Sequence, residues 1–82
     1  QGDLVKALDF MQKALRIQMQ SLGPDHQKTG SLYFDMADVC ERQGDLIKAK
    51  QFYGKAHALW LRTLGEDQPD TKMAQDRLER LK

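Results

Sequence analysis

Apolar residues recur at intervals of three and four along the chain, and no stretch alternates as a strand would. One such stripe in the first quarter of the chain comprises Leu4, Ala7, Leu8, Met11, Ala14 and Leu15, and a second beside it comprises Phe10, Ala14 and Ile17. Both stripes return later, as Leu46, Ala49, Tyr53 and Ala56 and as Phe52, Ala56 and Leu59. This spacing predicts amphipathic helices, and an apolar surface this broad favours a helix lying between two neighbours.

Two kinds of break separate the periodic segments. The short break is "QGD" at 43–45, where Gly44 tolerates a positive φ and Asp45 can cap the next helix. The longer breaks are "LGPDH" at 22–26 and "LGEDQP" at 64–69, in which Asp25 and Asp67 are expected to start the following helices. The chain is therefore predicted to be all-α, with helices over about 3–21, 27–42, 45–63 and 69–81.

The chain repeats itself with a period of 42 residues. Pairing residues 1–40 with 43–82 gives nine identities within residues 1–14 and four within 22–29, thirteen in all, against roughly two or three for unrelated sequences. The identities include "QGD" and the "LG-D" of the longer breaks, which unrelated amphipathic helices would not share at fixed spacing. Because one helix pair cannot cover the apolar faces alone, we expect the units to stack in a row as a solenoid.

The small-and-large pattern in these helices resembles that of tetratricopeptide repeats. Second-helix positions are matched by Gly44, Leu46, Ala49, Tyr53 and Ala56, and again by Gly2, Leu4, Ala7, Met11 and Ala14. First-helix positions are matched by Tyr33, Met36, Ala37 and Cys40. The 42-residue period and the "LGPDH" linker are similar to those of kinesin light chains and related adaptors. This resemblance implies antiparallel helix pairs stacked as a right-handed α-solenoid.

The repeat register predicts how the 82 residues are organised. Residues 1–26 contain the second helix of an incomplete repeat, 27–68 form one complete helix pair, and 69–82 form a C-terminal capping helix. Glu79 falls where the preceding unit has the small residue Ala37, and a charge there disfavours packing of a further helix. We expect the chain to be a fragment of a longer protein.

Composition excludes several classes of partner. The chain is 40% apolar and 30% charged, and its 13 basic and 12 acidic residues leave a formal net charge of +1. No bulk field is present to attract nucleic acid or an anionic membrane, and no apolar run is long enough for membrane insertion. The single cysteine, Cys40, builds no disulfide framework. We expect a cytoplasmic protein, with association with the cytoskeleton or a cilium left open.

Enzyme chemistry finds little support in the residue pattern. His26 lies in a turn and His57 on a helix, 31 residues away, so structural roles are expected for both. Cys40 falls on the apolar stripe and is expected to be a buried packing residue. Because no His, Cys, Asp or Glu cluster has metal-ligand spacing, we expect a non-enzymatic chain without metal or cofactor.

The resemblance implies that the chain docks a peptide or partner protein in a concave groove lined by the first helices of its units. The expected contact residues are Ser31, Phe34, Asp35, Asp38, Glu41, Arg42, Met73, Asp76 and Arg80. Phe34 can either offer an exposed ring to a peptide or pack on the neighbouring unit. Phe34 and Asp35 stand where the light-chain family tends to carry paired asparagines, whose amides can bind a peptide backbone.

Two further possibilities concern the surface of the array. Trp60 can pack beneath the last helix or form a second partner contact, including self-association through stacked repeats. The alternative to partner docking is a purely architectural role, in which the segment lengthens or caps a solenoid within a larger assembly.

Overall fold

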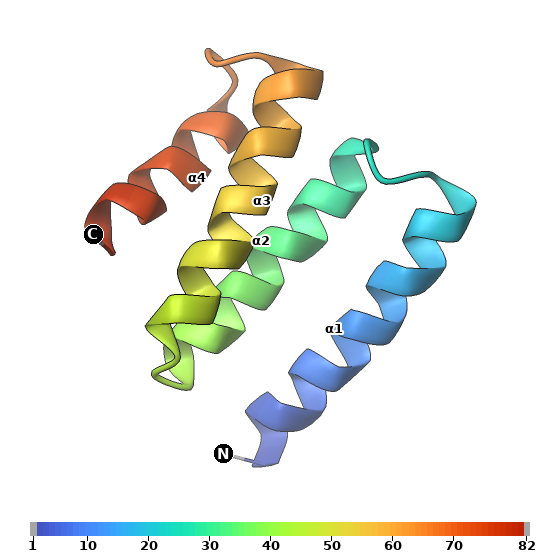
Figure 1. Cartoon of the computed structure of the whole chain (residues 1–82), viewed down its shortest axis with the longest axis vertical. Helices are drawn as coiled ribbons and strands as arrows, with labels where there is room; N and C mark the ends of the chain where they lie inside the picture. Colours follow the sequence, from blue (N-terminus) through green and yellow to red (C-terminus); the bar gives the residue numbers. More distant parts are fainter. Residues whose placement is uncertain (1, 82) are drawn as a thin grey trace.

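The computed structural model describes residues 2–81, and it consists of four α-helices. They are α1 (Gly2–Ser21), α2 (Gln27–Arg42), α3 (Leu46–Leu64) and α4 (Pro69–Arg80). Figure 1 shows them in chain order, with α1 and α4 on opposite sides of the α2–α3 pair. No strand occurs within residues 2–81. The all-α prediction is confirmed, and every end of the four expected helices lies within one residue of the observed end.

Glycines with a positive φ terminate the first three helices. Gly23, Gly44 and Gly65 have φ values of 88°, 87° and 91°, a region in which other residues are strained. These are the glycines of the repeated breaks, so the 42-residue period reflects the spacing of helix ends.

The N-caps of α2, α3 and α4 are three different types of residue. The side chain of Asp45 accepts a hydrogen bond from the backbone N–H of Lys48 at 3.1 Å, which confirms its predicted capping role. The expectation for Asp25 and Asp67 is wrong. The N-cap of α2 is His26, whose Nδ1 accepts from the N–H of Lys28, and the N-cap of α4 is Gln68. Asp25 instead binds Arg62.

The α2–α3 pair forms the most extensive interface in the molecule. Its centre is a cluster of fully buried residues, Ala37, Cys40, Ala49 and Tyr53. The small side chains let the two helix backbones approach closely. Cys40 is buried, as expected, and burial raises the pKa of its thiol, which keeps the group protonated and unreactive.

A second cluster connects α3 to α4. It consists of Ala56, Leu59, Trp60 and Ala74. The indole Nε1 of Trp60 donates to the carbonyl of Gln27 at 3.0 Å, and its ring lies against Gly30. Only 2% of Trp60 is exposed. The expectation that Trp60 provides a second partner contact is therefore wrong, and the alternative, packing beneath the last helix, describes its position.

Candidate functional site

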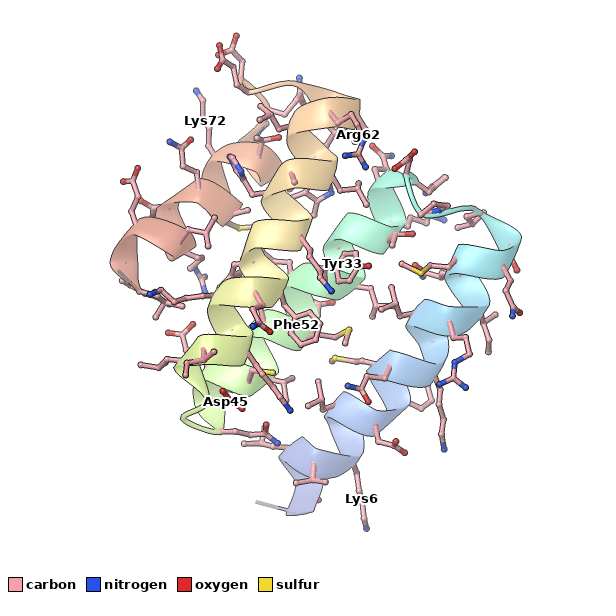
Figure 2. All side chains as sticks on the ribbon, in the orientation of Figure 1. Lys6, Tyr33, Asp45, Phe52, Arg62 and Lys72 are labelled. Carbon is pink, nitrogen blue, oxygen red and sulfur yellow. The ribbon has the colours of Figure 1, made fainter. Side chains whose placement is uncertain are left out.

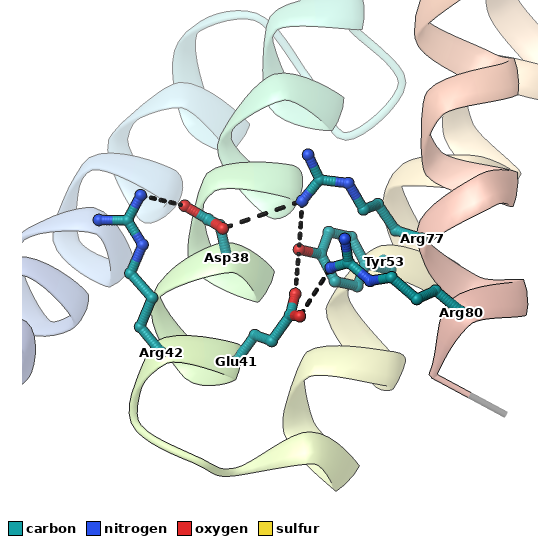
Figure 3. Close-up of polar contacts among 6 residues, drawn as sticks. All are labelled: Asp38, Glu41, Arg42, Tyr53, Arg77 and Arg80. Atoms are coloured by element: carbon teal, nitrogen blue, oxygen red, sulfur yellow. Dashed lines mark hydrogen bonds and ion pairs between the residues drawn. The ribbon is translucent and has the colours of Figure 1, made fainter.

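Helices α2 and α4 are joined by a polar network that also includes Tyr53 of α3 (Figure 3). We call the exposed face of α2 and α4 around this network the α2–α4 surface. Its ionic members are Asp38, Glu41 and Arg42 of α2 and Arg77 and Arg80 of α4.

Each carboxylate in the network has two partners. Asp38 binds Arg42 one turn later on α2 at 3.2 Å and Arg77 of α4 at 4.0 Å. Glu41 accepts a hydrogen bond from the Tyr53 hydroxyl at 2.9 Å through Oε1 and one from Arg80 at 2.6 Å through Oε2. Both carboxylates therefore connect α2 to α4.

The buried phenol of Tyr53 lies at the centre of the network. Its hydroxyl donates to Glu41 and accepts from Arg77 at 3.4 Å. Burial, together with the hydrogen bond to Glu41, raises the pKa of Tyr53 to about 12, although Arg77 acts in the opposite direction. The phenol is thus a neutral donor across the physiological pH range.

Phe34 lies between the three helices and is half-buried. Its ring makes an edge contact with Tyr53 at a centroid distance of 5.1 Å and lies 5.9 Å from Trp60. The guanidinium of Arg77 lies over the ring, 5.3 Å from its centroid. Phe34 thus packs mainly within its own helix pair and meets the next helix through Arg77, while part of the ring stays exposed at the α2–α4 surface.

Four of the expected contact residues lie outside the network and are exposed: Ser31, Asp35, Met73 and Asp76. Within residues 2–81, none of them takes part in a side-chain hydrogen bond or ion pair. Partial burial, followed by the nearby charge of Asp38, raises the pKa of the Asp35 carboxyl. Within residues 2–81, no ion pair compensates the carboxylate of Asp35.

The sequence-based list missed Arg77 and Tyr53. A signal for Arg77 was present, because the 42-residue period aligns it with Asp35 and aligns Arg80 with Asp38. The same surface positions thus carry acids on α2 and bases on α4. Opposite charges on helices that stack side by side are well placed to attract one another.

The remaining polar residues do not assemble a reaction centre. His26 caps α2, as its expected structural role implies, and His57 is half-buried on α3. Within the described part of the chain, no group of three or more His, Cys, Asp or Glu is arranged to hold a metal ion. None of the described helices combines the length and apolarity that crossing a membrane would need.

Two shallow cavities lie between neighbouring helices, and the first of them borders the α2–α4 surface at Arg42. One of about 350 Å³ is lined by Leu4, Val5, Arg42 and Gln43. Another of about 290 Å³ is lined by Pro24, Asp25, Tyr33, Lys55, Ala58, Leu59 and Arg62. The charged groups of the second cavity are already engaged, because Asp25 binds Arg62 and the ammonium of Lys55 lies over the rings of Tyr33 and Phe52.

Comparison with known proteins adds one finding. A family model described as "Tetratricopeptide repeat" matches residues 1–61, which span α1, α2 and most of α3. No curated protein matches the chain. The match does not distinguish a kinesin-light-chain-like subtype, so that assignment stays a prediction.

Proposed function

We propose that this chain, which belongs to the tetratricopeptide repeat family, is a non-catalytic interaction module that docks a basic, partly apolar peptide on the α2–α4 surface. Repeats of this family generally mediate protein–protein interactions. In this proposal the module is part of a cytoplasmic scaffold or adaptor of the kinesin-light-chain-like type, and the α2–α4 surface is the concave face of the array.

The observation that carries the proposal is the uncompensated carboxylate of Asp35. This group lies beside Asp38, whose charge is already shared between Arg42 and Arg77. A lysine or arginine of a partner placed near Asp35 would relieve the repulsion between the two carboxylates. Asp76, exposed on α4, adds a second acid to the same surface.

Apolar contacts would come from two side chains next to these acids. Met73 of α4 is 39% exposed, and Phe34 of α2 keeps an accessible part of its ring. A methionine adapts to ligands of different shape, and an aromatic ring offers area at a small entropic cost. A peptide with a basic residue beside an apolar one fits this combination.

The proposal is tested by selecting peptides from a random display library on the purified chain. We expect enrichment of sequences in which Lys or Arg neighbours an apolar residue. The double variant Asp35→Lys, Asp76→Lys should weaken the selected peptides by about tenfold or more, most strongly at low salt. Its circular dichroism spectrum should stay helical, because neither carboxylate takes part in the network.

The matched control is the double variant Glu66→Lys, Asp67→Lys, which makes the same charge change in the exposed turn between α3 and α4. It should bind the selected peptides as the parent chain does. An absence of enrichment, or equal losses in both double variants, would contradict docking on the α2–α4 surface.

A second candidate function is the architectural one, and a specific observation favours it. Glu41 and Arg80, which were expected to contact a partner, bind one another across α2 and α4, and Asp38, also expected to contact a partner, pairs with Arg77 of α4. In this reading the charges hold stacked helices together instead of recognising a ligand. The architectural role predicts no peptide enrichment, together with loosening of α4 when its arginines are replaced.

A further inference from the structure

The guanidinium group of Arg77 has three partners, and it holds each of them at long range. Its Nη1 lies 4.0 Å from Oδ1 of Asp38 and 3.4 Å from the hydroxyl of Tyr53. Its central carbon lies 5.3 Å from the centroid of the Phe34 ring. Figure 3 shows Arg77 reaching from α4 toward Asp38 and Tyr53. Because hydrogen bonds between charged groups are usually about 2.7–2.9 Å long, these groups can bind a guanidinium more closely than they bind Arg77.

Arg80, the other arginine that connects α4 to α2, is bound more tightly. Its Nη2 lies 2.6 Å from Oε2 of Glu41. Asp38, in contrast, would keep Arg42 as a partner at 3.2 Å if Arg77 moved away. Of the two arginines, Arg77 is therefore the one that can leave its place at the smaller cost.

The three partners of Arg77 together match the chemistry of a guanidinium group. Asp38 supplies a carboxylate, the hydroxyl of Tyr53 accepts a hydrogen bond, and Phe34 supplies the face of a ring. A planar guanidinium can stack on a ring while it donates hydrogen bonds in its own plane, which a compact ammonium group cannot do. We call these three residues the guanidinium subsite. Neither Phe34 nor the side chain of Asp38 is fully buried, so a ligand can reach the subsite when Arg77 turns away.

We propose that an arginine of the partner takes the place of Arg77 in the guanidinium subsite, and that Arg77 is an internal competitor for this position. The inference rests on the proposed function and narrows its basic peptide to one that carries arginine rather than lysine. Asp35 lies one turn before Asp38 on α2 and forms no ion pair within residues 2–81. Its carboxylate would attract the incoming cation to the same place.

The chain also contains a cation that lies over aromatic rings without a carboxylate. The Nζ of Lys55 lies 5.6 Å from the centroid of the Tyr33 ring and 5.7 Å from that of Phe52. Figure 2 shows these two rings between α2 and α3. Within residues 2–81, Lys55 forms no ion pair. Lys55→Ala therefore uncovers rings alone, which makes it a control for the contribution of Asp38.

The test uses N-acetyl-arginine amide, a small probe whose only charge is its guanidinium group. Binding is followed by NMR, through the ring signals of Phe34, in the parent chain and in Arg77→Ala. We expect the variant to bind the probe at least about tenfold more tightly, because an occupied site lowers apparent affinity by the fraction of time that it is open. N-acetyl-lysine amide should bind the variant more weakly than the arginine probe.

Two further controls separate the subsite from a general change of charge. Arg80→Ala removes the same charge from α4 and frees the carboxylate of Glu41, but it leaves Arg77 in the subsite. Neither Arg80→Ala nor Lys55→Ala should gain affinity for the probe. Adding Asp38→Asn to Arg77→Ala should abolish the gain. Arg77→Lys keeps the charge on α4 but competes less well than arginine, so its affinity should lie between those of the parent and Arg77→Ala.

The result that overturns the inference is equal binding of the probe to the parent and to Arg77→Ala, or an equal gain in Arg80→Ala. Selected peptides that accept lysine as readily as arginine would overturn it too, and the proposed function would then stand. An absence of enriched peptides would overturn the proposed function, and with it the partner's arginine, whatever the small probe does. The two failures are therefore distinguishable.

Discussion

At the scale of single residues, the contact between Gly30 and Trp60 determines how closely α2 and α3 approach. A Cβ added at Gly30 would lie 2.8 Å from Cδ1 of the indole. The indole has little freedom to move aside, since its Nε1 is hydrogen-bonded to Gln27 and its ring is 2% exposed. A glycine inside a helix, which is otherwise unfavourable, is here a packing requirement.

Gly30→Ala should therefore destabilise the chain by about 1–3 kcal/mol, although alanine is the better helix former. Gly54 provides the matched control, because it lies inside α3 and a Cβ there would meet nothing within 4 Å. Gly54→Ala should stabilise the chain by about 0.5–1 kcal/mol. Urea unfolding measures both, and a change of the same sign in the two variants would contradict the packing account.

Tyr53 leads to a pH prediction at the same scale. Its pKa rises from the ordinary 10.0 to about 12 in the folded chain. Because the folded state holds the phenol proton more tightly than the unfolded state does, this contribution to stability is complete below about pH 10. It is lost progressively as the pH rises from about 10 to about 12.

The test compares urea unfolding of the parent chain and Tyr53→Phe between pH 8 and 12. The parent should lose more stability than the variant over the upper part of this range. Tyr33, whose pKa is also raised by burial, is present in both chains, so its effect cancels in the comparison. Parallel pH profiles would show that Tyr53 ionises in the folded state as it does in the unfolded one.

At the scale of secondary-structure elements, α4 is held in place by two contacts, a small apolar one with α3 and a polar one with α2. Ala74 packs in the cluster around Trp60, while Arg77 and Arg80 reach the carboxylates of α2. Ion pairs that are partly exposed contribute little individually, so the apolar contact should carry most of the attachment. The arginines set the orientation of α4 beside α2.

Arg80→Glu should weaken this attachment by about 0.5–1 kcal/mol, because it places a second carboxylate opposite Glu41. The loss should shrink as salt is added. Lys72→Glu makes the same charge change on α4, but within residues 2–81 Lys72 forms no ion pair. That control should be neutral or slightly stabilising, since it adds an acid in the first turns of the helix. Thermal unfolding at low and high salt distinguishes the two variants. Equal losses of stability that do not depend on salt would contradict an ionic role for Arg80.

At the scale of the whole molecule, burial is concentrated in the middle of the array. Helices α2 and α3 hold eleven of the thirteen buried residues within 3–81, α4 holds the other two, and residues 3–21 of α1 hold none. Stacked repeats contact only their neighbours, so each helix is stabilised by the interfaces it forms. Local stability should therefore fall from the α2–α3 pair toward both ends.

Native-state hydrogen exchange should reveal this gradient. Amides of α2 and α3 should exchange most slowly, those of α4 faster, and those of α1 fastest among the helices. The free energy of global unfolding should be below about 5 kcal/mol, at the lower end for folded domains. Uniform exchange of all four helices at the global rate would show instead that the chain unfolds as one cooperative unit.

The order and approximate bounds of the helices, the glycine terminators, the burial of Cys40 and membership of a repeat family could be read from the sequence. Each depends on the local spacing of apolar residues or on the internal repeat. Both can be seen in the sequence, because an α-helix has 3.6 residues per turn and its buried face therefore follows a fixed spacing. Most of the α2–α4 surface was also found this way, because the helix period places Asp38, Glu41 and Arg42 on one side of α2.

Only the tertiary structure decided which of those side chains meet. The depth of Trp60 and the pairing of Arg77 and Arg80 with Asp38 and Glu41 depend on the register between helices far apart in the sequence. One helix's pattern does not encode that register, because packing angle and axial offset follow from all the side chains at an interface together. The residues expected to contact a partner were therefore found partly engaged within the chain, while Phe10 and Ile17 of α1 were left exposed.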